Sequence, residues 1–169
     1  MLKTVLAAVC AAVALAAGPA AAQGASPTLA KIKAAKAINV AYSPDSAPFS
    51  SVTGSAAPQG YAIELCQRVI AQIARAVGEP ELKVNWIAAP VAERVQMVAG
   101  GRAELDCANT TQTQTRLASV DFSNLIFIDG GGLLVKAGAP INRIADLAGK
   151  RVAVIKGTTT QARLIDGLQ

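Results

Sequence analysis

The hydrophobic positions of this chain switch repeatedly between the spacing typical of helices and that of strands. Apolar residues recur on one side of a helical projection from Tyr61 to Val77, which predicts an amphipathic helix that ends at Gly78. Short apolar runs at 37–42 and 82–87 lie on either side of it and predict strands. Strands that alternate with helices favour a mainly parallel sheet. We therefore predict the α/β fold class.

The stretch 90–127 repeats this alternation within a short distance. It predicts a helix between Pro90 and Gly100, a strand at 103–107, a polar turn at 109–115, a short helix around Arg116 and a strand that ends at Phe127. The turn holds four threonines, one asparagine and no carboxylate. Hydroxyl groups, free N–H groups at a helix start and a guanidinium suit a carboxylate ligand. A threonine-capped polar loop with a surface arginine is the alternative interpretation.

Two other parts of the pattern bear on function. The predicted loop 43–60 is long, and Phe49 within it is expected either to pack or to contact a ligand. Glu104 and Asp106 alternate with the apolar residues of the strand at 103–107. They are the nearest approach to a catalytic carboxylate pair, but a solvated strand face is the better interpretation of them.

Residues 1–22 have the pattern of a cleaved signal peptide. Lys3 precedes an apolar stretch that is too short to span a bilayer comfortably, and three alanines before Gln23 fit a cleavage site. An uncleaved membrane anchor is the competing interpretation. We expect the mature chain to be exported.

Composition then narrows the possible chemistry. The net charge is +5, but the basic residues are scattered and aromatic residues are few, so a nucleic-acid interface is not expected. The chain has no histidine, which removes the commonest general base and the commonest metal ligand. Cys66 and Cys107 are the cysteines that follow the leader, and either a disulfide or two buried free thiols would suit their positions.

The C-terminal part of the chain looks incomplete as a folding unit. It predicts strands at 133–136 and 152–155, a short helix at 144–147 and a helix that opens at 157–160. Roughly forty residues with so little helix fall below the size at which a core usually supports itself. We therefore expect one unit at 23–128, the start of a second, incomplete unit at 129–169, and a chain that is a fragment of a longer protein.

Several short motifs, in their order and spacing, resemble one known family along nearly the whole mature chain. The chain is similar to the periplasmic solute-binding proteins of amino-acid ABC importers (family 3), and most similar to their glutamate/aspartate-binding branch. The residues that carry the resemblance are Pro48-Phe49-Ser50, Gly60-Tyr61, Glu64-Leu65-Cys66, Glu93-Arg94-Val95, the run from Asp106 to Thr111, Arg116, Asp121-Phe122-Ser123 and the run from Leu147 to Thr159.

The resemblance implies a two-lobed protein that closes on one amino acid between its lobes. It also implies a periplasmic location, an ABC permease in the inner membrane as partner, a monomer, and no cofactor, metal or catalytic residue. Lobe one would be present and lobe two incomplete. The second-lobe aspartate that holds the ligand's ammonium would lie beyond Gln169.

The resemblance also assigns ligand-binding residues. Arg116 and Thr111 would hold the α-carboxylate, and the backbone carbonyl of Asn109 would accept from the α-ammonium. Thr158 would meet the same carboxylate from the second lobe, and Arg94 would face the side chain of an acidic ligand. Phe49 and Ser43 complete the predicted set.

Two departures weaken the expected preference for an acidic ligand. Ser43 stands where the branch often has an arginine, and Val91 stands where it has a serine. Loss of one guanidinium would remove roughly 1.5–3 kcal/mol of charge-assisted hydrogen bonding. Glutamate or aspartate is therefore the leading ligand, with glutamine or another polar amino acid as the alternative.

Other functions of the same fold remain open from the sequence. A dehydratase-like periplasmic enzyme would need an acid–base pair, and the predicted cleft residues are Ser, Thr, Asn and Arg. A ligand-sensing domain of a receptor is the third possibility. A binding protein that is not an enzyme is the prediction.

Overall fold

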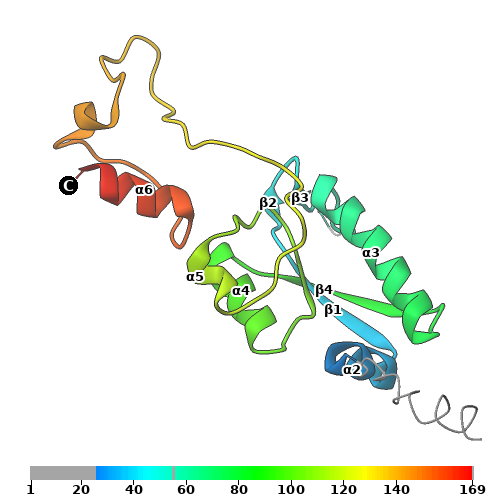
Figure 1. Cartoon of the computed structure of the whole chain (residues 1–169). Helices are drawn as coiled ribbons and strands as arrows, with labels where there is room; N and C mark the ends of the chain where they lie inside the picture. The colour runs from blue at the N-terminus through cyan, green and yellow to red at the C-terminus, as the bar shows by residue number, and fades with distance from the viewer. Residues whose placement is uncertain (1–25, 55, 169) are drawn as a thin grey trace, which may run out of the picture.

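The computed structural model describes residues 26–54 and 56–168, so the predicted signal peptide lies outside the described residues. The N-terminal elements are α2 (Pro27–Ala35), β1 (Ala37–Tyr42), β2 (Asp45–Ser46), β3 (Ser50–Ser51), α3 (Tyr61–Val77) and β4 (Lys83–Ala88). They are followed by α4 (Val91–Ala99), β5 (Leu105–Cys107), α5 (Gln114–Leu117), the 3-10 helix η1 (Ile144–Leu147) and α6 (Thr159–Leu168). Figure 1 shows their arrangement.

A parallel sheet in the order β4-β1-β5 organises the first two thirds of the described chain. Ala37 on β1 pairs with Lys83 on β4, and Val40 pairs with Leu105 on β5. The predicted α/β fold class is confirmed. In a parallel sheet all carboxyl ends lie at one edge, and ligands usually bind in the crevice outside that edge.

Helices cover both faces of this sheet. On one face, α2 and α3 pack over Ile38, Val40 and Tyr42 of β1, with Ile32 and Ile63 buried between them. On the other face, α4 packs over Ala41 and contributes Met97. Successive strand residues point to opposite faces, so alternation along one strand, β1, supplies both cores. Figure 1 shows α3 and α4 on opposite sides of β1.

A disulfide ties the largest helix to the sheet. Cys66 on α3 and Cys107 at the end of β5 are bonded, with Cα atoms 6.1 Å apart and a sequence separation of 41. Closing a loop of this length constrains the unfolded chain and stabilises the native state by about 4 kcal/mol in the chain-entropy model. Of the two alternatives that the sequence left open, the structure has the disulfide.

The carboxylates of the strand at 103–107 are not solvated, so that prediction was wrong. The side chain of Glu104 is 4% exposed; it bonds Lys31 at 2.6 Å and accepts from the main-chain nitrogen of Asn39 at 2.7 Å. Asp106 is 13% exposed and pairs with Arg94. A buried carboxylate needs such partners to offset the loss of its hydration. Both acids are therefore tied into the fold.

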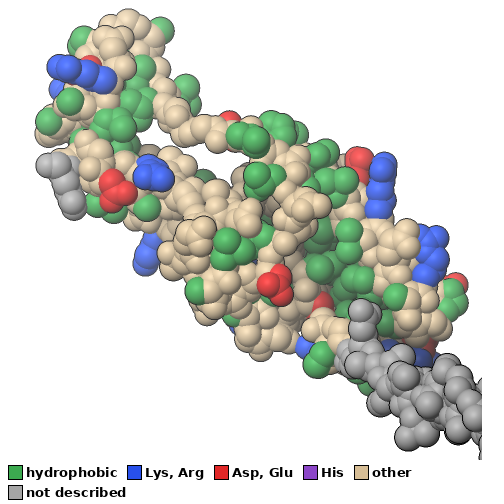
Figure 2. Space-filling view, viewed as in Figure 1, with side chains coloured by type: hydrophobic (Ala, Val, Ile, Leu, Met, Phe, Trp, Pro, Cys, Tyr) green, Lys and Arg blue, Asp and Glu red, His purple; other side chains and the backbone are tan. Residues whose placement is uncertain are grey.

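Beyond α5 the chain is largely extended, and the strands predicted at 133–136, at 152–155 and up to Phe127 do not form. A strand needs a neighbouring strand for its backbone hydrogen bonds, and the described chain places none beside these segments. Their side chains are exposed; Leu134 is fully exposed and Ile155 is 70% exposed. Figure 2 shows hydrophobic side chains on the surface of this C-terminal segment. The two helices expected there, η1 and α6, are present and contact each other.

None of the helices within residues 26–54 and 56–168 combines the length and the apolar character that crossing a membrane requires.

Candidate ligand-binding site

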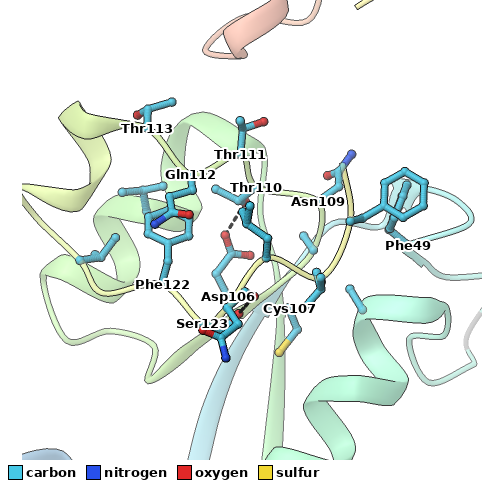
Figure 3. Close-up of a pocket in the computed structure, with 18 of the residues that line it drawn as sticks. Phe49, Asp106, Cys107, Asn109, Thr110, Thr111, Gln112, Thr113, Phe122 and Ser123 are labelled. Atoms are coloured by element: carbon cyan, nitrogen blue, oxygen red, sulfur yellow. Dashed lines mark hydrogen bonds between the residues drawn. The ribbon is translucent and has the colours of Figure 1, made fainter. Parts of the chain in front are cut away.

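A cleft of about 1360 Å³ opens beside the carboxyl end of β5. Its walls come from β5 and the loop 109–113, from Phe49 and α3, from the extended segment 122–131, and from the first turns of α6. Figure 3 shows the loop residues from Asn109 to Thr113 together with Asp106 and Phe49. The cleft exceeds the 300–1,000 Å³ that is typical of small-molecule pockets. An amino acid would fill only part of it.

The loop that carries Phe49 is held by the start of α3. The main-chain nitrogens of Tyr61 and Ala62 donate to the carbonyls of Pro48 and Phe49 at 3.0 and 2.9 Å. Gly60 permits this approach, because a Cβ there would lie 2.6 Å from the Phe49 carbonyl oxygen and φ is +127°. These bonds satisfy N–H groups that a helix start leaves free. The helix thus fixes the position of the Phe49 backbone.

Phe49 packs, which is one of the two alternatives that the sequence suggested, and its contact with a ligand stays a prediction. Its ring packs edge-on against Tyr61 and Phe127, with centroids 6.2 and 5.0 Å apart, and it also lines the cleft. The hydroxyl of Tyr61 donates to the carbonyl of Ile126 at 2.9 Å. The extended segment after α5 is thereby held against the 43–60 loop at one end of the cleft.

Ser43, which was predicted to contact the ligand, does not line the cleft. The residue is 4% exposed. Its hydroxyl donates to Asp45 at 3.0 Å and lies 2.8 Å from the hydroxyl of Ser46, while its main-chain nitrogen donates to the hydroxyl of Ser50. These bonds use the side chain to hold the loop together.

The polar loop presents two of its predicted residues to the cleft. Asn109 and Thr111 are exposed and line it. The short helix α5 follows, and the Thr113 side chain caps it by accepting from the main-chain nitrogen of Arg116 at 3.2 Å. Arg116 then reaches back to the loop, where its Nη1 donates to the carbonyl of Thr111 at 2.6 Å.

The start of α6 meets this loop from the other side. Nη2 of Arg116 donates to the carbonyl of Gly157 at 3.3 Å, and the hydroxyls of Thr111 and Thr159 lie 3.4 Å apart. Two segments more than forty residues apart in the sequence therefore meet at one guanidinium. Arg116 itself does not line the cleft, whereas Thr111, whose carbonyl it bonds, does.

Thr158, which was predicted to meet the ligand's carboxylate, does not line the cleft. Its hydroxyl donates to the carbonyl of Ile155 at 2.8 Å and accepts from the main-chain nitrogen of Gln161 at 3.1 Å. It therefore caps α6, and the T-x-x-Q spacing from Thr158 to Gln161 is the sequence signal of such a cap. Its neighbours Thr159 and Thr160 line the cleft instead.

Arg94 is also placed differently from the prediction that it faces a ligand. Its side chain is 1% exposed, and its guanidinium bonds Asp106, the Ala89 carbonyl and the Thr110 hydroxyl. Thr110 in turn donates to Asp106 at 2.6 Å, as the dashed line in Figure 3 shows. The guanidinium makes these three hydrogen bonds beneath the loop and is not part of the cleft wall.

Burial and charge act in opposite directions on the ionisable groups here. Burial raises the pKa of Asp106, against the opposing effects of Arg94, Thr110 and Arg116. Burial lowers the pKa of Arg116, against the attraction of Asp106 and with the repulsion of Arg94. No cluster of His, Cys, Asp and Glu within the described ranges could hold a metal ion.

Sequence reasoning missed the contributions of Thr110, Thr159 and Tyr61 to this region. The tyrosine carried no local signal, because its hydroxyl partner lies 65 residues away. The capping spacing at 158–161 did carry one, since it reserves Thr158 for the helix and leaves the next threonine free.

Solved structures share this fold. An ancestral amino acid-binding protein described as a precursor of cyclohexadienyl dehydratase is 26% identical, with a TM-score of 0.70 over 83% of this chain and 61% of that one. The arginine-bound form of ArgBP from T. maritima has a TM-score of 0.68 at 24% identity over 82% of this chain and 64% of that one. The second likeness concerns the fold alone.

Curated relatives match at higher identity. The L-glutamate/L-aspartate-binding protein of Pseudomonas aeruginosa is 36% identical over 81% of this chain and 46% of its own length. The glutamate/aspartate import solute-binding protein of Escherichia coli is 32% identical over 90% of this chain and 52% of its own length. The chain thus spans about half the length of the curated relatives it matches.

The family model for bacterial extracellular solute-binding proteins, family 3, matches residues 38–168. That range includes all of the parallel sheet except Ala37, the polar loop and α6. The resemblance found in the sequence is confirmed, and the chain belongs to the bacterial extracellular solute-binding proteins of family 3.

Proposed function

We propose that this chain is the amino-acid-binding part of a periplasmic solute-binding protein that serves an ABC permease, with glutamate or aspartate as the favoured ligand. The observation that carries the proposal is that Thr111 and Thr159 line the cleft with their hydroxyls 3.4 Å apart, while Arg116, outside the cleft wall, donates to the carbonyls of Thr111 and Gly157. The relatives named for glutamate and aspartate binding support this choice of ligand.

The α-carboxylate would bind beside Thr111 and Thr159. A guanidinium carries five N–H donors, and two of the Arg116 nitrogens hold carbonyls, so further donors remain for a carboxylate. Each charge-assisted hydrogen bond is worth about 1.5–3 kcal/mol. The hydroxyls of the two threonines would add neutral donors, and the backbone carbonyl of Asn109 would accept from the α-ammonium.

Glutamine is the second candidate ligand, and the burial of Arg94 favours it. The predicted partner of an acidic side chain is already paired with Asp106. A carboxylate at the end of the ligand would have to find its cation elsewhere, for example at Arg163, which lines the cleft on α6. An amide would need no such partner.

The two-lobed organisation remains part of the proposal. Residues 23–128 would form lobe one and residues 129–169 the beginning of lobe two, with closure around the ligand stabilised by contacts to both. The contacts of Arg116 with Gly157 and of Thr111 with Thr159 are of this kind. We propose that the chain works as a monomer in the periplasm.

We further propose that the chain is not an enzyme. General acid–base catalysis needs a positioned proton donor and acceptor in the cleft. Asp106, the carboxylate nearest the loop, is held by Arg94 and Thr110. The relatives named above are binding proteins, which supports the same view.

The test is nuclear magnetic resonance titration of the oxidised mature chain with glutamate, aspartate and glutamine, because this method detects millimolar affinities. We expect shifts at the amides of Thr111, Arg116 and Thr159. Arg116→Ala should abolish them, whereas Arg102→Ala, which removes an exposed arginine elsewhere, should not. Absence of shifts with all three amino acids, or unchanged binding by Arg116→Ala, would overturn the proposal.

A further inference from the structure

We propose that Arg94 is a positioning residue for the ligand loop: it fixes residues 109–113 through the hydroxyl of Thr110 and does not touch the ligand. The part of this inference that concerns a ligand rests on the proposed function. The geometry that carries it does not depend on a ligand.

The guanidinium of Arg94 joins four parts of the chain. From α4, its Nε donates to Asp106 Oδ1 on β5 at 2.9 Å, and its Nη1 donates to the carbonyl of Ala89, just after β4, at 2.9 Å. Its Nη2 donates to Thr110 Oγ1 in the loop at 3.2 Å. With 1% of the residue exposed, these bonds replace the hydration of the charge.

Thr110 transmits this arrangement to the loop. Its single hydroxyl accepts a hydrogen bond from Arg94 and donates one to Asp106 Oδ2 at 2.6 Å. Both of these bonds hold the side chain of Thr110 against the buried ion pair. Fixing Thr110 therefore fixes the backbone between Asn109 and Thr111, both of which line the cleft, and Figure 3 shows Thr111 pointing away from Asp106.

The root of the loop is held on the opposite face as well. Asp106 and Cys107 are consecutive on β5; the first is bonded to Arg94 of α4 and the second is linked to Cys66 of α3. The strand end is thus clamped between the two helices that cover the sheet. The loop departs from a rigid point, which is what precise placement of ligand donors requires.

A direct contact between Arg94 and a ligand would undo this network. Arg94 is 1% exposed and lies outside the cleft wall, so its guanidinium would have to move to reach a ligand, and the buried Asp106 would lose its cation. Removing one partner of a buried pair is strongly unfavourable. The buried bonds of Arg94 therefore keep it from contacting the ligand, and they make it a support for the loop that does.

The first arm of the test needs no ligand. Hydrogen–deuterium exchange would be compared for Thr110→Val, which keeps the shape and removes the hydroxyl, and Thr110→Ser, which keeps the hydroxyl. We expect exchange at 109–113 to rise about fivefold in Thr110→Val and to stay within about twofold of the original protein in Thr110→Ser. Exchange in β1 and α3 should not change. Equal loop exchange in both variants would overturn the inference.

The second arm measures affinity. The loop is proposed to bind the α-carboxylate and α-ammonium groups, which all amino acids share. Thr110→Val should therefore weaken the binding of glutamate, aspartate and glutamine by the same factor. Arg94→Lys, which keeps the charge, should have the same effect. Loss of glutamate and aspartate alone in Arg94→Lys would identify a direct contact and overturn the inference. If the original chain binds none of the three, the proposed function fails, and the exchange result still decides the role of Thr110 and Arg94.

Discussion

Asp106 connects Arg94 with the polar loop, because it pairs with Arg94 and also accepts a hydrogen bond from Thr110. Its burial raises its pKa even though Arg94, Thr110 and the more distant Arg116 all favour the charged form. Desolvation of a carboxylate acts in this direction, and a cation or a hydrogen-bond donor acts against it. The sign of the net effect can be tested directly.

A carboxyl group whose pKa is raised on folding binds its proton more tightly in the native state than in the unfolded state. The contribution of Asp106 to stability should therefore fall as the pH rises from the ordinary value of about 3.8 through the raised pKa, and stay constant above it. The measurement is the difference in unfolding free energy between the original protein and Asp106→Asn, taken from denaturant titrations between about pH 4 and 7. A difference that grows in favour of the original protein with rising pH would show that the ion pair outweighs burial.

At the scale of elements, the contact between α6 and the polar loop depends on one glycine. A Cβ on Gly157 would lie 2.8 Å from the Cβ of Ala92 at the start of α4, and φ there is +79°. Gly157 also offers its carbonyl to Arg116. A side chain at this position would push the start of α6 away from Arg116 and Thr111.

Gly157→Ala should therefore loosen α6, and Gly138→Ala is a matched control. Gly138 has φ of +76° but nothing within 4 Å of an added Cβ, so both variants share the backbone strain of about 1–2 kcal/mol and only Gly157→Ala adds the clash. We expect faster amide exchange in α6 and at Thr111 for Gly157→Ala alone. Equal exchange in the two variants would mean that α6 does not rest on Ala92.

The sequence predicted the elements well where local patterns decide them. The α3 helix and β1 have the predicted bounds, because apolar spacing and the glycine after α3 are local signals. The three C-terminal strands failed, because pairing requires a neighbouring strand that no local pattern guarantees. An apolar run indicates that burial of the segment would be favourable, but it does not show which part of the chain could bury it.

The candidate site was predictable to a similar extent. Residue type pointed to Arg116 and to the threonines of the polar turn in general, and the family resemblance singled out Thr111 among them. The role of Arg94 was not visible, because it depends on where β5 places Asp106 beside α4. Apolar spacing alone predicts that Val91, Val95 and Val98 form the buried face of that helix, yet its buried residues are Arg94 and Met97. A charged residue can be buried when a nonlocal partner exists, and periodicity cannot detect that partner.

On the scale of the whole molecule, the stabilising core lies entirely in the first part of the chain. Both core clusters consist of residues up to Cys107, and the buried hydrophobic residues described beyond them are Ala108 and Leu147. The segment from 124 onward is joined to the rest by contacts such as Tyr61 with Ile126, Phe49 with Phe127 and Arg116 with Gly157. Each such hydrogen bond or aromatic pair is worth about 0.5–1.5 kcal/mol.

Removing residues 124–169 should therefore leave a domain that still unfolds cooperatively, with roughly 1.5–4.5 kcal/mol less stability from the three contacts. Ile32→Ala, a single change at a side chain that is 1% exposed in the main core, should cost a comparable 2–5 kcal/mol. Urea unfolding followed by the fluorescence of Trp86, the one tryptophan of the chain, would compare the two. Trp86 is suited to this because it lies on β4 and packs edge-on against Tyr42 of β1, so its signal reports the sheet. If the shortened chain lost its cooperative transition while Ile32→Ala kept it, the extended segment would be holding the fold together despite its exposure, and lobe one could not be regarded as a folding unit.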